Sequence, residues 1–390
     1  MKRLISILVA LSAWGIAIGQ PSVRIAHGPY LQQVTDDGFT VVWTTTINAA
    51  SWVEVAPDDG SHFYAAERPK YYDSHIGKRR IGRLHRVRVE GLAPGTTYRY
   101  RIMQQGVLCD EGNKRVVLGE GYGSDILKHK PYTATTLDEK KDQTEFWVVN
   151  DIHAQDSIFR LLLEGAEKAK PDFVCFNGDM LTSMESEKQL FEGYLNSAAE
   201  LLTPAGIPIF ATRGNHENRG SFSPSFLDYF PTSTGEVYYT FRQGPAYFVV
   251  LDCGEDKPDS DIEYGGLGAY DAYREEEAAW LRETVASEEF RNASARIVLL
   301  HIPLGNGTWH GNIHLEELFL PILNDADIDV MLSGHTHRYS FHPANDKVRF
   351  PVLVNDNASL LKCDVGDGKI TARIYGPEGT VRHSHEFPLK

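Results

Sequence analysis

The sequence has few cysteines, no long apolar run after its first nineteen residues, and no excess of positive charge. Only 4 of its 390 residues are cysteine, and no two of them form a C-x-x-C pair, so they indicate no chemistry. No later segment is long and apolar enough to cross a membrane as a helix, so no transmembrane segment is expected. The formal net charge of −14 argues against nucleic acid as a structural partner, because proteins that follow the phosphate backbone are basic.

The sequence also lacks internal repeats and low-complexity tracts. Its composition, with 42% hydrophobic and 24% charged residues, is typical of a folded protein and argues against extensive disorder. A chain of this length is expected to form two or three domains.

Residues 1–19 have the pattern of a signal peptide. Lys2 and Arg3 form a basic start, residues 4–18 are mostly apolar, and small residues precede a plausible cleavage point before Gln20. The apolar stretch is shorter than the ~18 residues of a membrane span. We therefore expect an exported protein, periplasmic or secreted, and a short uncleaved anchor is the alternative.

Residues 22–137 show strand signals separated by turns and almost no helical periodicity. Residues 39–44 are rich in β-branched and aromatic side chains and follow an Asp-Asp-Gly turn, and residues 85–89 alternate between polar and apolar. Several short strands at this spacing predict a small antiparallel β-sandwich. Residues 138–144 are a polar linker.

From residue 145 to residue 390, short apolar strands alternate with helical patterns, which predicts an α/β domain. Helices are expected over residues 157–170, 185–202 and 273–287.

Five strands of this second region each run directly into Asp, Asn or His. Ligands bind outside the carboxyl ends of strands in open α/β sheets, and these residue types coordinate divalent transition metals. Two of the pairs are spaced at i, i+2, which places both side chains on one face of an extended segment. Gly178, Gly214 and Gly334 are expected to allow tight turns and close approach of the backbone. The residues are Asp151 and His153, Asp179, Asn215 and His216, His301, and His335 and His337.

This ordered set of D-x-H, GD, GNH-[DE], H and GH-x-H resembles the calcineurin-like metallophosphoesterase superfamily. In the first region, residues 92–100 are similar to a corner of a fibronectin type III domain. Residues 28–31 and 40–43 resemble the sandwich that precedes the catalytic domain of purple acid phosphatases. The resemblance implies an α/β/β/α sandwich of two mixed sheets flanked by helices over residues 145–390, preceded by a small all-β, fibronectin III-like sandwich.

The resemblance also implies roles for the individual residues. It implies a phosphate ester substrate, cleaved by a hydroxide held between two divalent ions, which could be Zn, Mn, Fe or Co. His216 would be the catalytic residue that assists the leaving group, and not a ligand. Asp151, His153 and His337 would bind one ion, Asn215, His301 and His335 the other, and Asp179 would bridge the two.

The sequence departs from its relatives at Thr182. Purple acid phosphatases have a tyrosine there as a ligand of ferric iron and lack the histidine of D-x-H, whereas this chain has His153. The resemblance therefore implies that the purple charge-transfer colour is absent. Many protein phosphatases have an aspartate at this position to orient the catalytic histidine, and here Glu217 or Glu185 could take that part.

Three residues are candidates for binding the substrate. Arg213 and Arg219 flank the Gly214 turn and could bind phosphate bidentately, although structural salt bridges are an equal alternative. His310 lies on a predicted loop after the strand that delivers His301, where an ordinary exposed histidine is the alternative.

Three functions compete on this basis. A phosphomonoesterase is favoured by the sandwich that resembles that of acid phosphatases. A phosphodiesterase or nucleotidase would use the same metal core with different pocket walls. A surface-binding protein with a vestigial metal site is the third, and it is disfavoured because no ligand position is broken.

Overall fold

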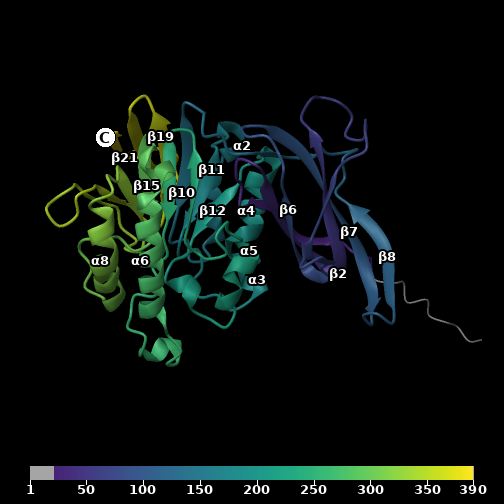
Figure 1. Cartoon of the computed structure of the whole chain (residues 1–390), viewed down its shortest axis with the longest axis horizontal. Helices are drawn as coiled ribbons and strands as arrows, with labels where there is room; N and C mark the ends of the chain where they lie inside the picture. The colour runs from purple at the N-terminus through teal and green to yellow at the C-terminus, as the bar shows by residue number, and fades with distance from the viewer. Residues whose placement is uncertain (1–21, 390) are drawn as a thin grey trace, which may run out of the picture.

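The structure is a computed structural model that describes residues 22–389 (Figure 1). The predicted signal peptide and its cleavage point lie outside the described residues. Over residues 22–389, no helix combines the length and apolar character needed to cross a membrane. An all-β unit lies at one end of the molecule and a larger α/β unit at the other (Figure 1).

The N-terminal unit is antiparallel throughout, and the long strand β2 organises it. The first half of β2 pairs with β1 and β6, whereas its second half pairs with β3 and β7, so this one strand pairs with four others. The expected all-β unit is thereby confirmed. Its strands are β1 (Ile25–Gln32), β2 (Phe39–Pro57), β3 (Lys70–Tyr72), β6 (Gly82–Val89), β7 (Thr97–Asp110), β8 (Val116–Gly123) and β9 (Tyr132–Thr135), with a small ribbon of β4 (Ser74–His75) and β5 (Lys78–Arg79).

The α/β unit contains two six-stranded mixed sheets. In the first sheet β10, β11 and β12 are parallel, and in the second β14, β15, β16 and β18 are parallel. The first sheet has the order β12 (Ile209–Thr212), β11 (Phe173–Asn177), β10 (Thr144–Val149), β19 (Leu360–Gly366), β20 (Lys369–Tyr375), β21 (Val381–Pro388). The second has the order β13 (Tyr239–Gln243), β14 (Ala246–Val250), β15 (Ala295–Leu299), β16 (Val330–Ser333), β18 (Val352–Val354), β17 (Ser340–His342).

Helices cover the outer face of each sheet, which completes the expected α/β/β/α sandwich. The side chains of α1 (Asp156–Leu163) and α4 (Asn196–Leu202) pack on the first sheet, and those of α6 (Tyr270–Ala286) and α8 (His310–Leu323) pack on the second. The shorter helical segments are α2 (Ala166–Ala169), α3 (Glu187–Leu190), η1 (Phe191–Leu195), η2 (Thr203–Ala205), η3 (His216–Asn218), η4 (Ser223–Ser225), α5 (Phe226–Tyr229), η5 (Ile262–Tyr264) and α7 (Glu288–Arg291).

Two helix predictions need correction. The helix expected over residues 157–170 is interrupted at Gly165, whose φ of 87° ends α1 and begins α2. The predicted loop that carries His310 is instead the first turn of α8. Neither a side-chain cap nor a proline at the helix start marks this helix in the sequence, and Pro321 inside it argues against a helix.

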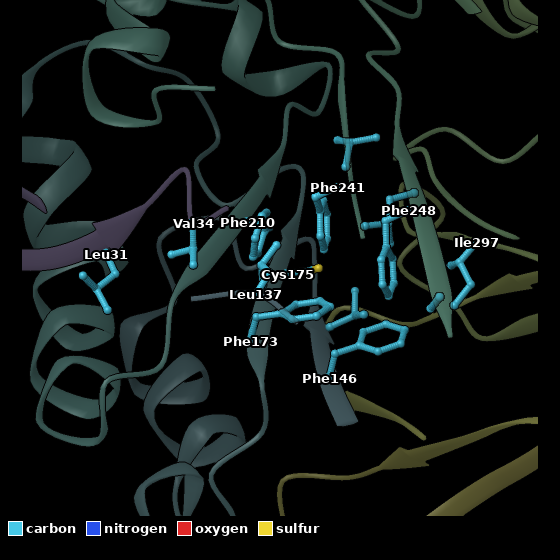
Figure 2. Close-up of a cluster of buried hydrophobic side chains, with 14 of the residues drawn as sticks. Leu31, Val34, Leu137, Phe146, Phe173, Cys175, Phe210, Phe241, Phe248 and Ile297 are labelled. Atoms are coloured by element: carbon cyan, nitrogen blue, oxygen red, sulfur yellow. The ribbon is translucent and has the colours of Figure 1, made fainter. Parts of the chain in front are cut away.

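Aromatic side chains fill the space between the two sheets (Figure 2). Phe146 and Phe173 from the first sheet contact Phe248 from the second at ring-centroid distances of 5.0 and 5.2 Å. Phe241 stacks on Phe210 at 3.8 Å and on Phe248 at 4.6 Å. This core fixes one sheet against the other, and therefore fixes the strand ends that deliver the polar residues.

The all-β unit is attached to the α/β unit by buried contacts. The hydroxyl of Tyr30 donates to the carbonyl of Tyr229 at 3.0 Å, and the hydroxyl of Thr203 donates to the carbonyl of Pro29 at 2.6 Å. The linker also contacts the α/β unit, since the backbone N–H of Asp138 donates to Gln243 Oε1 at 2.8 Å. Contacts of this kind hold the two units in one arrangement.

Candidate metal centre

The predicted ligands lie just beyond the carboxyl ends of β10, β11, β12, β15 and β16. Five of the seven adopt left-handed backbone conformations, which residues other than glycine rarely adopt and which cluster at functional sites. The φ values are 54° at Asp151, 47° at His153, 54° at Asp179, 70° at His335 and 57° at His337. Sharp turns therefore follow the strands at the positions where the sequence places its polar residues.

Hydrogen bonds between the loops fix these turns to one another. The backbone N–H of Asp151 donates to the carbonyl of Gly178 at 3.0 Å. Asp179 Oδ1 accepts from the backbone N–H of His216, and Asp151 Oδ2 accepts from that of His335, both at 2.9 Å. One oxygen of each carboxylate is thus used to hold a neighbouring loop, and the other is left for the centre of the site.

The glycines expected at the turns are required by close contacts. Gly178 has a φ of 84°, and a Cβ at this position would lie 2.5 Å from His301 Nδ1. A Cβ at Gly334 would lie 2.5 Å from Asp151 Oδ2, and one at Gly214 would clash with Asp179. Any side chain at these positions would therefore displace a predicted ligand.

The side chains form three overlapping groups around a common centre. Ligand atoms of Asp151, His153 and His337 lie within 4.8 Å of one another, and so do those of Asp179, His301 and His335. The third group, His153, Asp179 and His216, connects these two and includes the predicted catalytic histidine. Asn215 Oδ1 lies 3.1 Å from His335 Nδ1 and joins the second group. All seven predicted ligands are thus brought together at one centre, and their roles as ligands remain predictions.

The predicted ligands differ in burial. The side chains of His301 and Asp151 are fully buried, and that of Asp179 is 2% exposed. The side chain of His337, by contrast, is 46% exposed. The site therefore opens to solvent on the side of His337.

A hydrogen bond made by one ring nitrogen of a histidine determines which nitrogen faces the centre of the site. His301 Nδ1 lies 2.7 Å from the carbonyl of Asn177, so it carries the hydrogen and leaves Nε2 for the site. Nε2 of His153 and Nε2 of His337 lie only 3.0 Å apart. When both rings are neutral and turn their lone pairs toward each other, the lone pairs repel. A cation between the two nitrogens would relieve this repulsion.

Buried charge produces large pKa shifts at this centre. Burial alone would lower the pKa of His301, but Asp179 and Asp151 outweigh it and raise the pKa to about 10. Burial lowers the pKa of His335 to about 4, so this ring is neutral and able to act as a ligand. The carboxylates therefore create a strong attraction for positive charge at the place where His301 Nε2 points.

The donor set fits divalent metal ions. Asp151 Oδ1 is buried and accepts no hydrogen bond from the described residues, although three imidazole Nε2 atoms lie 3.3 to 4.0 Å away. His301 Nε2 faces Asp179 Oδ2 at 3.0 Å. Imidazole nitrogens with carboxylate and amide oxygens are the ligands of Zn, Mn, Fe and Co, and this set suits any of them.

Glu217 holds two of the loops together beneath the site. Its buried carboxylate accepts backbone hydrogen bonds from Asp179 at 2.8 Å, Gly214 at 3.0 Å and Leu181 at 3.1 Å. Burial, and then the charge of Asp179, raises the pKa of Glu217 to about 7. Glu217 therefore positions the loops and does not contact the His216 ring as a hydrogen-bond partner.

His216 is oriented by a contact that the sequence did not reveal. Its Nδ1 lies 2.7 Å from the carbonyl of Thr182, the position at which relatives have tyrosine or aspartate. Nε2 is then directed toward the centre, 3.9 Å from Asp179 Oδ2. The Thr182 hydroxyl also lies 3.5 Å from His153 Nδ1. Since every residue has a carbonyl, no residue type could have indicated this contact.

The three substrate candidates all have acidic partners. Arg213 forms a bidentate pair with the buried Asp252, and Arg219 forms one with Glu255 at 2.9 and 3.1 Å. Arg219 Nη1 also lies 3.3 Å from both ring nitrogens of His216. His310 Nε2 lies 2.8 Å from a carboxylate oxygen of Asp271 at the start of α6. Of the three, Arg219 is the one in contact with a predicted catalytic group.

Comparison with known proteins agrees with this geometry. Residues 144–339 match the calcineurin-like phosphoesterase family, and residues 28–115 match the purple acid phosphatase N-terminal domain. The chain is 24% identical over 365 residues to purple acid phosphatase 21 of Arabidopsis thaliana, which covers 85% of this chain and 72% of that protein.

A solved structure shares the fold. The purple acid phosphatase PPD1 from seeds of yellow lupin, Lupinus luteus, superimposes with a TM-score of 0.60 at 15% identity, over 92% of this chain and 74% of that one. The family match alone spans half of the chain, from β10 past the last predicted ligand. The protein therefore belongs to the calcineurin-like phosphoesterase family and is a metal-dependent phosphoric ester hydrolase.

Proposed function

We propose that the protein is an exported phosphomonoesterase with a dinuclear metal centre. The observation that carries the proposal is the convergence of the ligand atoms around Asp151 and Asp179, whose carboxylates face imidazole Nε2 atoms at 3.0 to 4.0 Å. The all-β unit supports the monoesterase over a diesterase or nucleotidase, because it matches a domain of acid phosphatases.

In this proposal Asp151, His153 and His337 would hold one ion, Asn215, His301 and His335 would hold the other, and Asp179 would contribute to both. Divalent ions held there would supply polarisation of the phosphoryl oxygens and a nucleophile from water at neutral pH. Glu217 and the backbone hydrogen bonds between the loops hold the ligands in place before the ions bind.

His216 is proposed to act on the leaving group. Its Nδ1 hydrogen is engaged by the Thr182 carbonyl, which fixes the ring and directs Nε2 toward the centre. A proton on Nε2 can pass to the alkoxide oxygen as the ester P–O bond breaks. Arg219, held by Glu255, restricts the ring from its other side.

The test compares a chromogenic phosphate monoester with the matching diester. The protein is stripped of metal and then reloaded with Mn or Zn before each assay. We expect metal-dependent hydrolysis with the monoester turned over faster. Faster turnover of the diester would establish the second function instead. A folded, loaded protein that cleaves neither ester would favour a surface-binding protein.

Export is the second part of the proposal, and it rests on the pattern of residues 1–19. The measurement is the N-terminal sequence of the protein recovered outside the cytoplasm of an expressing cell. A mature chain that begins at Gln20 is the expected result. An intact start at Met1, found in the membrane fraction, would indicate an uncleaved anchor.

A further inference from the structure

A cavity of about 270 Å³ lies directly beside the candidate metal centre. Its walls come from the loop after β15, from the first turn of α8, from the loop that carries His335 and from β17. Because His335 belongs both to the predicted metal site and to this wall, a substrate whose phosphate lies at the centre would extend its alcohol portion into the cavity.

Trp309 lies in the wall of the cavity. Its side chain is 53% exposed, although tryptophan is among the residues with the largest apolar surface. Lys257 Nζ lies 5.5 Å from the ring centroid, a cation–π contact. Leu304 adds a second apolar contribution to the same wall. An exposed indole beside a catalytic centre is suited to contact with a planar ring.

Asn312 also lines the cavity and is only 4% exposed. Its Oδ1 is buried and accepts no hydrogen bond from the described residues, so this atom is not presented to the cavity as an acceptor. On the other wall, the Asn306 amide lies 3.2 Å from His342 Nδ1, and Ser340 Oγ lies 3.0 Å from His342 Nε2, so His342 is already satisfied.

The wall is fixed by contacts that need no ligand. Glu316 Oε1 accepts backbone hydrogen bonds from Gly305 at 2.7 Å and from Gly307 at 3.4 Å. Lys347 pairs with the other carboxylate oxygen of Glu316 at 2.6 Å and also donates to the carbonyl of Gly305 at 2.8 Å. A preorganised wall loses little freedom on binding, which favours a specific subsite.

The cavity lining includes no Asp, Glu, Lys or Arg among the described residues. The lining itself therefore suits a neutral group, and the ammonium of Lys257, which lies against the Trp309 ring, is not part of it. Together with the indole, this favours a monophosphate ester over a di- or triphosphate.

We propose that this cavity is the leaving-group subsite, and that it selects phosphate monoesters whose leaving group carries a planar aromatic or heteroaromatic ring. The proposal rests on the proposed function, since it places the phosphate at the metal centre. Aryl phosphates and nucleoside monophosphates share this chemistry, and the test separates them.

The experiment compares kcat/KM of the metal-loaded protein for tyrosine O-phosphate, adenosine monophosphate and glycerol phosphate. The variants are Trp309→Leu and, as a matched control, Ile313→Ala, since Ile313 is 45% exposed on the same helix and does not line the cavity. We expect a preference for at least one ring-bearing ester over glycerol phosphate. Trp309→Leu should reduce that preference by about tenfold, the upper end of an aromatic contact, and Ile313→Ala should leave it unchanged.

A binding measurement needs no turnover and separates the two proposals. Calorimetry with the alcohols alone, tyrosine, adenosine and glycerol, uses the wild type and Trp309→Leu. Ring-bearing alcohols that bind the wild type more tightly than the variant would support the subsite, even if no ester were hydrolysed and the proposed function failed. An equal ring preference in both proteins, in turnover and in binding, would overturn it.

Discussion

The all-β unit and the α/β unit each bury a histidine completely, and the two histidines are shifted in opposite directions. His85 in β6 has its Nε2 2.9 Å from the Thr45 hydroxyl, and burial lowers its pKa to about 4. At His301, two carboxylates overcome burial and raise the pKa to about 10. Burial alone therefore does not identify a ligand histidine, whereas convergent carboxylates around a buried ring do.

The largest effect is expected from Asp179→Asn, which removes one of the carboxylate charges that raise the pKa of His301. The amide can still accept from the His216 backbone, so the loop should remain in place. We expect kcat/KM to fall on the order of 10³-fold or more, because a preorganised electrostatic group is lost. Bound metal, measured on the same sample, should fall as well. The control is Asp325→Asn at an exposed ion pair, and unchanged metal content with unchanged turnover would argue against a bridging role.

His216→Gln tests a ring that faces the same centre without being a predicted ligand. We expect turnover to fall by ~10²–10⁴-fold for an alkyl phosphate, whose leaving group needs a proton, and by much less for p-nitrophenyl phosphate. The metal content should not change. Equal losses for both esters, together with loss of metal, would show that His216 is a ligand and not a leaving-group acid.

His85 should make the stability of the folded protein depend on pH. Its folded pKa of about 4 lies below its ordinary value of 6.5, so the folded state disfavours the proton. The resulting stability is present above pH 6.5 and is lost as the pH falls from 6.5 toward 4, by about 3 kcal/mol in total. Denaturant unfolding of the wild type and of His85→Gln, at pH 7 and pH 4, measures this loss. The variant should lose less stability, and identical losses would refute the assignment.

The two groups of the site should also differ from one another. His337 is half exposed, so His337→Gln should weaken the binding of one ion, and excess metal should restore activity. His301→Gln removes a fully buried ring and should not be rescued in the same way. Turnover measured across a metal titration distinguishes them. Equal rescue of both variants would mean that the difference in burial has no consequence for binding.

The smallest expected effect is the absence of a visible absorption band. Thr182 stands where purple acid phosphatases have the ligand tyrosine, so this position provides no phenolate. Protein loaded with iron should therefore show no purple charge-transfer absorption. A visible band that persists after Thr182 is substituted would have to come from a metal ligand other than the seven predicted residues.

Much of the site could be predicted because each strand end carries its residues in an unambiguous order. Asp151 and Asp179 follow neighbouring parallel strands of the first sheet, and His301 and His335 follow neighbouring parallel strands of the second. The separation into two groups could be expected from the resemblance alone, and it remains a prediction, although the structure brings all seven residues to one centre.

The rest depends on contacts that have no sequence signature. The Thr182 carbonyl that orients His216 is a backbone atom, and the acidic partners of Arg213 and Arg219 come from residues 36 to 39 positions later in the chain. The start of α8 was missed because His310 begins the helix without a cap signal. That error also concealed the position of Trp309 at the cavity wall.

The most direct test is a titration of metal-stripped protein with Mn or Zn, in which bound metal and hydrolysis of a phosphate monoester are measured on the same samples. The account predicts no turnover without metal and activity that rises with occupancy to two ions per chain. Undiminished hydrolysis by the metal-free protein, or a fully loaded and folded protein that cleaves no phosphate ester, would contradict it.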